Sequence, residues 1–261
     1  MNISVNSEIL SIVVPAYNEQ STIESVVEAL IQVPHLLEIV VVNDGSKDST
    51  GKILDTLAQK YHKITVIHHS INKGKTAALK NGFRATQGEV VIVQDADLEY
   101  DPREIPDVIG PILENKADVV YGSRFLVRKA SRVLYFYHFL ANKFLTFLSN
   151  ILTNVNMTDI ETCYKSFRGE IIRNMIIESQ GFGFEIEVTA KVAKLKCRIY
   201  EVPISYYGRT YEEGKKISMR DGIYAIWYIV YYNCFCPLQS SFSSQFLYQY
   251  STSKSKNSNE K

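Results

Sequence analysis

The sequence predicts an α/β fold with a mostly parallel central sheet and helices on both faces. Three observations favour this class. Short apolar runs alternate with amphipathic segments of helical period through the first 123 residues. One run, Ile39 to Val42, consists only of β-branched residues, as in a strand covered on both faces. The segments between the runs are long enough to be crossover helices, which is typical of βαβ units.

The expected elements follow one another closely along the chain. Residues 10–14 form a strand ended by Pro15, and Ser21 to Glu24 form a capping box that starts a helix ended by Pro34. The next helix is capped by the segment from Asp48. Further strands are expected at 39–42, 64–67, 90–93 and 118–121, and further helices at 49–61, 76–86 and 105–115.

The pattern changes after residue 124. Residues 132–152 read as one long helix, apolar apart from a narrow polar stripe made by His138, Asn142, Thr146 and Ser149. Helices at 170–178 and 185–194, a strand at 198–202 and an aromatic segment at 223–232 follow. Neither apolar segment is a good bilayer span, because Lys143 interrupts the first and the second falls short of ~20 residues. The tail from residue 237 is polar and is expected to be disordered.

The chain has 261 residues and a formal net charge of +1, which conceals an asymmetry. Residues 1–123 carry 17 acidic and 10 basic side chains, whereas residues 124–261 carry 11 and 19. A hydrophobic fraction of 46% excludes wholesale disorder. The four cysteines lack metal-site spacing and the N-terminus lacks a secretory signal, so a cytoplasmic location is expected. Nucleic acid is not an expected partner, because no known binding module is present.

Four polar segments, at 14–19, 43–50, 94–99 and 121–124, follow expected strands. Open α/β sheets bind ligands at this edge. In the third segment Asp95, Asp97 and Glu99 alternate, and alternate side chains share one side of an extended backbone. Three converging carboxylates would favour Mg²⁺ or Mn²⁺, and such an ion would hold a diphosphate. A solvated acidic loop is the alternative.

Several single residues near these segments have two possible roles. Asp44 can accept hydrogen bonds from a base or ribose, although the Asp44-Gly45 pair is also typical of a plain turn. Lys75 is either a phosphate contact or an exposed lysine at a helix start. Asp159 is either a helix cap or, with Glu161, a candidate general base for a hydroxyl acceptor. No GxxxxGK[ST] loop is present to support ATPase chemistry.

In their order and spacing, the segments VVPAYNE, VVNDGSKDST, NKGKTAALKNGF, DADLEYDP and YGSRF resemble the GT-A fold glycosyltransferases of family 2. The later segments TDIETCYKSFR, GFEIEVTAKVAKLKCRIYEVPISY and GRTYEEGKK resemble the branch that contains dolichyl-phosphate mannose and glucose synthases. The resemblance covers residues 9–233. It implies a nucleotide-diphospho-sugar transferase fold with C-terminal amphipathic helices at a membrane interface.

The same resemblance implies an activity. A hexose, mannose or glucose, would move with inversion from a GDP- or UDP-linked donor to a polyprenyl or dolichyl phosphate. The enzyme would act as a peripheral protein at the cytosolic face of the membrane. A lipid phosphate is already an anion at neutral pH, so its attack needs positioning and charge neutralisation but no general base.

The resemblance also assigns roles to residues. The residues that match nucleotide-binding loops are Pro15, Tyr17, Glu19, Val42 and Asp44. The metal and diphosphate motif is matched by Asp95, Ala96 and Asp97, and Glu99 stands where mannose synthases often have Gln. Contacts to donor and acceptor phosphates are expected from Lys75, Arg124, Arg132, Arg209 and Lys215. The expected catalytic residues are Asp97, Arg124, Arg209 and Lys215, and the expected metal ligands are Asp95, Asp97 and Glu99.

These roles divide the chain into three regions. A catalytic domain spans 9–210, with a donor half at 9–123 and an acceptor half at 124–210. A basic and aromatic segment at 211–236 and a tail at 237–261 follow. The long helix and the aromatic segment either dock on a membrane or pack on the sheet as core helices. Two other functions stay open: transfer to a saccharide hydroxyl, and an inert binding subunit that keeps the fold.

Overall fold

The computed structural model describes residues 7–126, 132, 135–208 and 219–259. Within them, seven strands form one sheet in the order β3-β2-β1-β4-β6-β5-β7. Neighbouring strands run parallel except where β6 meets β4 and β5. The predicted mostly parallel sheet is therefore confirmed, and β6 is a short antiparallel strand that the sequence analysis missed. The strands are β1 (Leu10–Ala16), β2 (Leu36–Asn43), β3 (Ile64–His68), β4 (Val90–Val93), β5 (Val119–Ser123), β6 (Lys165–Arg168) and β7 (Ile199–Pro203).

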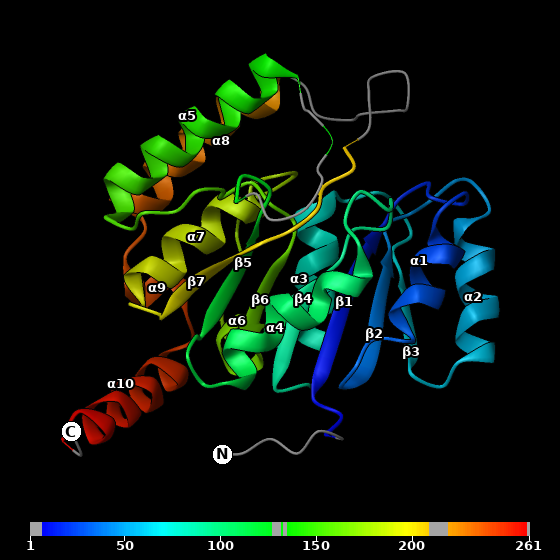
Figure 1. The fold of residues 1–261 in the computed structure, drawn as a ribbon, viewed down its shortest axis with the longest axis horizontal. Helices are drawn as coiled ribbons and strands as arrows, with labels where there is room; N and C mark the ends of the chain where they lie inside the picture. The colour runs from blue at the N-terminus through cyan, green and yellow to red at the C-terminus, as the bar shows by residue number, and fades with distance from the viewer. Residues whose placement is uncertain (1–6, 127–131, 133–134, 209–218, 260–261) are drawn as a thin grey trace.

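Helices lie in front of and behind the sheet (Figure 1), as the sequence predicts. The helices from the first half of the chain are α1 (Ile23–Leu30), α2 (Thr50–Lys60), α3 (Lys75–Ala85), η1 (Pro102–Glu104) and α4 (Ile105–Leu113). Those from the second half are α5 (Phe136–Thr153), α6 (Gly169–Arg173), α7 (Phe184–Lys194), α8 (Met219–Val230), η2 (Tyr231–Phe235), α9 (Leu238–Ser241) and α10 (Ser244–Asn259). The helix expected at 170–178 is wrong in extent, because α6 ends at Arg173.

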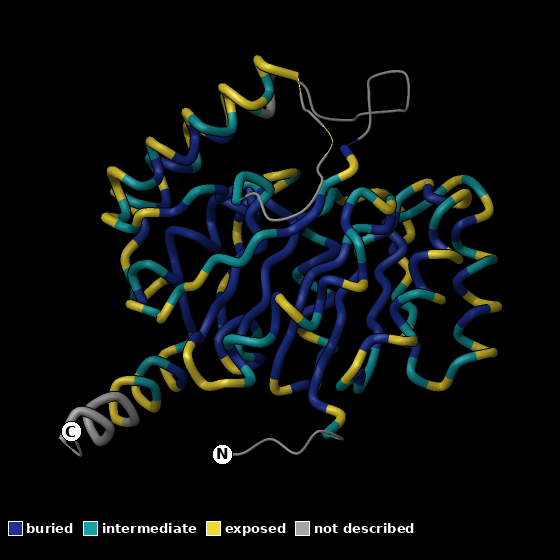
Figure 2. The backbone as a smooth tube through the Cα atoms, viewed as in Figure 1, coloured by how far each residue is buried: buried dark blue, intermediate teal, exposed yellow. Residues whose placement is uncertain are grey.

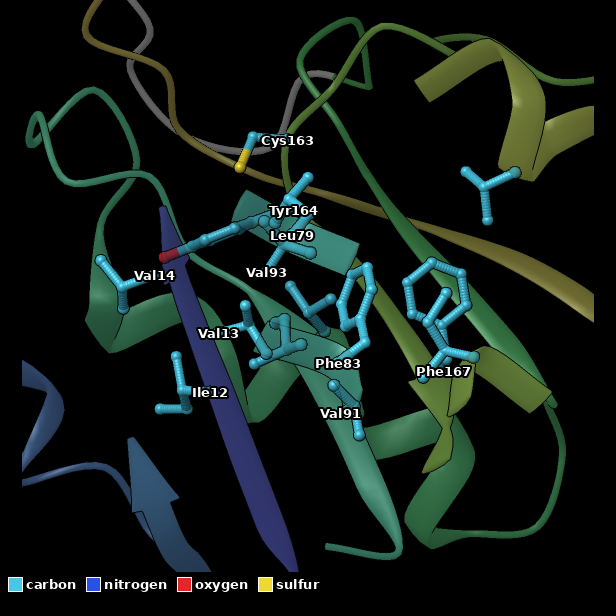
Figure 3. Packing of buried hydrophobic residues seen from close by; sticks show 14 of the residues in the cluster. Ile12, Val13, Val14, Leu79, Phe83, Val91, Val93, Cys163, Tyr164 and Phe167 are labelled. Atoms are coloured by element: carbon cyan, nitrogen blue, oxygen red, sulfur yellow. The ribbon is translucent and has the colours of Figure 1, made fainter. Parts of the chain in front are cut away.

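The core lies between the sheet and the helices on its faces. Figure 3 shows β1 and β4 side chains beside Leu79 and Phe83 of α3. Phe83 and Phe167 of β6 meet edge to face, with ring centroids 6.4 Å apart. Gly82 lets α3 approach the sheet, because a Cβ there would come within 2.4 Å of Val13 Cγ1. This close packing fixes the start of α3 at the carboxyl edge of the strands.

Two helix starts differ from the expected caps. The capping box at Ser21 is wrong: Thr22 precedes α1, and no side chain caps the helix. The Thr22 hydroxyl instead donates to the Ala96 carbonyl, at 2.7 Å, and so joins two of the polar loops. At α2 the residue at the N-cap position is Ser49, with no side-chain cap of its own, although Asp48 Oδ1 accepts from the Thr50 amide at 3.0 Å.

The expected disordered tail is also wrong over most of its length, because residues 238–241 and 244–259 are helical. Aromatic side chains explain the order. Phe242 and Phe246 are buried at 1% and 5% exposure, and Phe242 forms a β-bridge with Met175. The polar composition of this segment does not reveal that its few aromatic side chains are buried.

The long helix α5 lies beside α8, above the carboxyl edge of the sheet (Figure 1). Its outward face is exposed (Figure 2). In the described residues, no helix is both long and apolar enough to cross a membrane.

Candidate active site at the carboxyl edge of the sheet

The loops after β1, β2 and β4 meet, as the sequence analysis predicts. The Asp44 amide donates to the Ala16 carbonyl at 2.8 Å, and the Glu19 amide donates to Thr50 Oγ1 at 2.9 Å. With the Thr22–Ala96 hydrogen bond, these contacts join all three loops. Parallel strands place their carboxyl ends on one edge, so loops distant in sequence become neighbours.

The residues expected to bind a nucleotide differ in exposure. Pro15 and Tyr17 are half-buried, whereas Glu19 is buried and Val42 is fully buried in β2. Pro15 and Val42 are register partners across the β1–β2 pair. The fully buried Val42 side chain therefore supports the loops from within the sheet and offers no surface to a ligand.

Asp44 lies buried at the centre of a hydrogen-bond network. Its Oδ1 faces His69 Nδ1 at 2.6 Å, and its two oxygens accept the amides of Lys73 and Gly74 at 2.9 and 2.8 Å. His69 Nε2 faces the Asn81 side-chain amide at 2.7 Å, so it accepts there while Nδ1–H donates to Asp44. Asp44 thus holds the loop before α3. His69 was not expected from the sequence, where its only signal is its place two residues after the expected strand at 64–67.

The expected convergence of three carboxylates is wrong in part. In the described residues, no group of three or more His, Cys, Asp or Glu is placed to hold a metal ion. The reason is local: residues 96–97 form a turn and Leu98 has a φ of 59°, so the backbone is not extended. Glu99 points to Tyr206, whose hydroxyl donates to Glu99 Oε2 at 2.7 Å. Asp95 and Asp97 remain as the acidic pair around the buried Ala96.

Lys75 begins α3 and binds two carboxylates. Its Nζ lies 2.9 Å from Asp95 Oδ1 and 3.3 Å from Glu185 Oε1. Burial alone would lower the pKa of Lys75, but Asp95 and then other nearby anionic groups outweigh it and keep that pKa well above its ordinary value. The exposed-lysine alternative is wrong, since Lys75 is a half-buried cation 2.9 Å from Asp95 in the acidic loop.

Arg124 follows β5 and forms a close pair with Asp159. Arg124 Nε and Nη2 donate to Asp159 Oδ2 and Oδ1 at 2.7 and 2.8 Å. Burial would raise the pKa of Asp159, but the Arg124 guanidinium outweighs burial and holds that pKa below its ordinary value. The helix-cap alternative for Asp159 is wrong, because no helix begins there. Glu201 of β7 supports the pair by accepting the amides of Thr158 and Asp159 at 2.9 and 3.2 Å.

A second buried group of charges lies beside this pair. Burial, and then the Glu185 carboxylate, raise the pKa of Glu161 to about 7. Burial lowers the pKa of Lys165 in the same group. Glu161 Oε1 and Glu185 Oε2 are buried and have no hydrogen-bond partner among the described residues. The sequence analysis considered Glu161 but missed Glu185, which looks like a surface residue in a first helical turn.

Of the other basic residues expected to contact phosphate, the structure describes Arg132 only. Arg132 is exposed, and its Nη1 donates to the Gly208 carbonyl at 2.8 Å. Arg209 and Lys215 lie outside the described residues, as does most of the basic part of the 211–236 segment. The guanidinium carbon of Arg124 lies 5.2 Å from the centre of the Tyr206 ring. Tyr206 therefore links Arg124 to the loop that carries Asp95 and Asp97.

An exposed apolar surface borders the site. Within the described residues we define it by the following large side chains on α5, α8 and η2: Phe136, Tyr137, Leu140, Phe144, Phe147, Ile151, Ile223, Tyr224, Ile226, Trp227, Tyr231 and Phe235. On α5 the polarity is inverted, because the polar residues Thr146 and Ser149 are buried at 2% exposure while Phe147 is 62% exposed. A contiguous exposed apolar surface of this kind marks an interaction site.

With this geometry in place, comparisons identify the family. Residues 11–176 match the profile of Glycosyl transferase family 2, and the chain therefore belongs to that family and is a glycosyltransferase. It is 29% identical to the undecaprenyl-phosphate mannosyltransferase of Micrococcus luteus over 78% of this chain and 85% of that protein. It is 28% identical to the polyprenol monophosphomannose synthase of Mycolicibacterium smegmatis, over 76% and 77% of the two chains.

Two further comparisons concern length and fold. The chain is 30% identical to the dolichol-phosphate mannosyltransferase of Pyrococcus furiosus over 79% of its own length, but spans only 58% of that protein. Glucosyl-3-phosphoglycerate synthase of Mycobacterium tuberculosis, solved with Mn²⁺ and UDP-glucose, superposes with a TM-score of 0.67 at 20% identity, covering 87% and 79% of the two chains. The GT-A fold predicted from the sequence is confirmed.

Proposed function

We propose that this glycosyltransferase moves a hexose from a nucleotide sugar to a polyprenyl phosphate, with inversion, at the cytosolic face of a membrane. One observation carries the proposal: Arg124 lies between the acidic loop at 95–99 and the exposed apolar surface of α5 and α8. Tyr206 links Arg124 to that loop, and Asn142 of α5 lies within 3.5 Å of Arg124 Nη2. An acceptor suited to this arrangement combines an anion with a long apolar chain.

The relatives support the same acceptor and favour mannose. The Micrococcus luteus, Mycolicibacterium smegmatis and Pyrococcus furiosus proteins are named for mannosyl transfer to undecaprenyl, polyprenol or dolichol phosphate. The solved structures bind UDP-glucose, but at 20% identity they support the fold alone. We therefore place GDP-mannose ahead of UDP-glucose as the donor.

Asp95 and Asp97 fit a divalent cation. Mg²⁺ commonly binds through one or two carboxylates and fills its other positions with substrate phosphates and water, so a pair suffices without Glu99. When bound, Mg²⁺ or Mn²⁺ would neutralise charge on the donor diphosphate. Lys75, held beside Asp95, adds a second positive charge at the same place.

The chain's own residues then orient the acceptor. Arg124 is fixed by two hydrogen bonds to Asp159, so its remaining N–H groups are preorganised toward a phosphate. Fixed cations stabilise charge that shifts from acceptor to leaving group without reorganising during the reaction. The phosphate oxygen attacks the anomeric carbon opposite the nucleoside diphosphate, which accounts for inversion. The apolar surface of α5 and α8 would lie in the membrane interface and hold the lipid chain.

The hydroxyl-acceptor alternative requires a general base. Asp159 is a poor one, because its buried carboxylate is committed to Arg124 and its pKa is lowered. Glu161 is the better candidate, since a pKa near 7 suits proton transfer at neutral pH. This single residue keeps the alternative worth testing.

A donor-by-acceptor screen tests the proposal. GDP-mannose and UDP-glucose, each labelled in the sugar, are incubated with undecaprenyl phosphate, dolichyl phosphate or a soluble saccharide, with Mg²⁺ or Mn²⁺. We expect an organic-extractable, mild-acid-labile product with a lipid phosphate and label from one donor. Label found only in aqueous products would favour the saccharide alternative, and no transfer at all would favour an inert binding subunit.

A further inference from the structure

Helix α5 carries one cation on an otherwise uncharged surface. Lys143 is half-buried, between the exposed Phe144 and the polar Asn142. It is the residue whose charge argues against a membrane span in this segment, and neither the comparisons nor the sequence motifs assign it a role.

The Lys143 side chain turns toward the body of the protein and reaches the surroundings of Arg124. Its Nζ donates to the Thr158 carbonyl at 3.2 Å, one residue before Asp159. The same Nζ lies 4.3 Å from the centre of the Phe125 ring, and the Arg124 guanidinium carbon lies 5.7 Å from that ring. Two cations from different parts of the chain therefore lie near the same aromatic ring.

Arg124 and Lys143 differ in how many of their N–H donors are already bonded within the protein. Arg124 is paired with Asp159. Lys143 has no carboxylate within 4.0 Å among the described residues, and Thr158 O is the one hydrogen-bond acceptor found for it there. An ammonium has three N–H donors, so two remain for a ligand or water.

We propose that Lys143 binds the phosphate of the lipid acceptor together with Arg124. The inference rests on the proposed function and deepens it. The same helix then supplies the apolar contact for the lipid and the cation for its phosphate, so the depth of α5 in the interface sets the height of the phosphate above the donor. Lys143 is thus a positioning contact on the acceptor side and takes no part in binding the nucleotide.

The test uses the full-length protein and steady-state kinetics with undecaprenyl phosphate and the donor identified by the screen. In Lys143→Met, which keeps the apolar stem, we expect the KM for undecaprenyl phosphate to rise at least tenfold, as for loss of a charge-assisted hydrogen bond. The KM for the donor should stay within twofold. Lys143→Arg should recover the acceptor KM to within about threefold, because a cation is restored.

Two controls separate this role from others. Lys60→Met, which removes an exposed lysine of α2 paired with Glu28, should leave both KM values unchanged. Flotation with phosphatidylcholine–phosphatidylglycerol vesicles that lack polyprenyl phosphate should give equal binding for wild type and Lys143→Met. Unequal binding would overturn the inference in favour of a general membrane contact.

Other outcomes of these experiments also decide whether Lys143 binds the acceptor phosphate. An unchanged acceptor KM in Lys143→Met would overturn the inference. A lowered Tm, with the rate reduced by the same factor at every acceptor concentration, would overturn the inference and assign Lys143 a supporting role for Thr158 only. If Lys143→Met does not fold, Lys143→Arg against Lys143→Gln gives the same comparison. Failure of the proposed function is distinguishable, because wild type would then form no lipid-linked sugar.

Discussion

Glu99 and Asp97 are two residues apart in one acidic loop, yet their side chains serve different partners. Glu99 accepts a hydrogen bond from Tyr206, which stacks near Arg124, whereas Asp97 accepts the Glu99 amide at 3.2 Å. The turn at 96–98 separates the two side chains. The acidic loop therefore combines a candidate metal pair with an anchor for the acceptor side.

Because the Asp97 and Glu99 side chains have different partners, variants at the two positions should differ in their metal dependence. Glu99→Gln keeps a hydrogen-bond acceptor for Tyr206, so the Mn²⁺ concentration for half-maximal activity should change less than threefold. Asp97→Asn should raise that concentration, or reduce the activity at saturating Mn²⁺, at least a hundredfold, since a charged ligand is lost. Equal effects of the two variants on metal activation would show that Glu99 is a ligand after all.

Glu161 predicts a pH dependence of stability. Its pKa is raised from 4.5 to about 7 in the folded protein, so folding favours the protonated acid. The stabilisation is complete below about pH 4.5 and is lost as pH rises through about 7, at a cost of up to about 3 kcal/mol. Glu161→Gln stays neutral and should gain stability relative to wild type between pH 5 and 8.

Urea denaturation at pH 5, 6, 7 and 8 measures this difference. Glu114→Gln, which changes an exposed carboxylate paired with Lys116, should track wild type at every pH. A stability difference between Glu161→Gln and wild type that is constant with pH would contradict the protonated state of Glu161.

At the scale of elements, α5 reverses the usual relation between polarity and burial. Its buried residues are Thr146 and Ser149 together with Leu145, and its exposed face carries aromatic and aliphatic side chains. Burying one large apolar side chain contributes about 1.5–3 kcal/mol, so several together would hold the protein at an interface. The sequence reveals the narrow polar stripe, but only the fold shows that the stripe points inward.

Charged substitutions on α5 test this surface. Phe144→Glu or Phe147→Glu should each reduce binding to anionic vesicles at least tenfold in a flotation assay, because a carboxylate replaces an exposed ring that would insert into the membrane interface, and it repels the headgroups. Tyr248→Glu on α10, where the tyrosine is 75% exposed and outside the apolar surface, should bind like wild type. Wild-type binding by both α5 variants would contradict membrane docking through this face.

Helix α10 makes a second prediction at this scale. Phe246 is 5% exposed and its ring lies 5.6 Å from Phe242 and 5.3 Å from Tyr250. Phe246→Ala should lower the free energy of unfolding by about 3 kcal/mol. The matched change Tyr248→Ala, at an exposed ring on the same helix, should alter it by no more than about 0.5 kcal/mol. Equal effects in urea denaturation would mean that α10 does not pack on the body.

For the whole molecule, the pattern of apolar runs predicted the sheet because β4 is entirely apolar and β1 and β2 each contain an unbroken apolar run, Ile12 to Val14 and Ile39 to Val42. It missed β6, whose four residues include a buried lysine and are held by neighbours on both sides. Strand ends predicted that the loops of Asp44 and Asp95 would meet. The partners of Asp44 and of the acidic loop, such as His69, Glu185 and Tyr206, come from distant parts of the chain. No local sequence pattern predicts them.

The two halves of opposite charge now have distinct places in the fold. The acidic half forms strands β1 to β5 and the donor loops, where Lys75 and the proposed cation balance Asp95 and Asp97. The basic half contributes α5 with Lys143, and α5 carries part of the exposed apolar surface. A lipid phosphate would bind where the two halves meet.

The most direct test of this account is the fate of labelled mannose when the wild-type protein, GDP-[¹⁴C]mannose, undecaprenyl phosphate and Mn²⁺ are combined. We predict label in the organic phase, released as free mannose by mild acid, and loss of that signal by at least a hundredfold in Arg124→Met. Label that enters only water-soluble products, or lipid product that forms equally well in Arg124→Met, would contradict it.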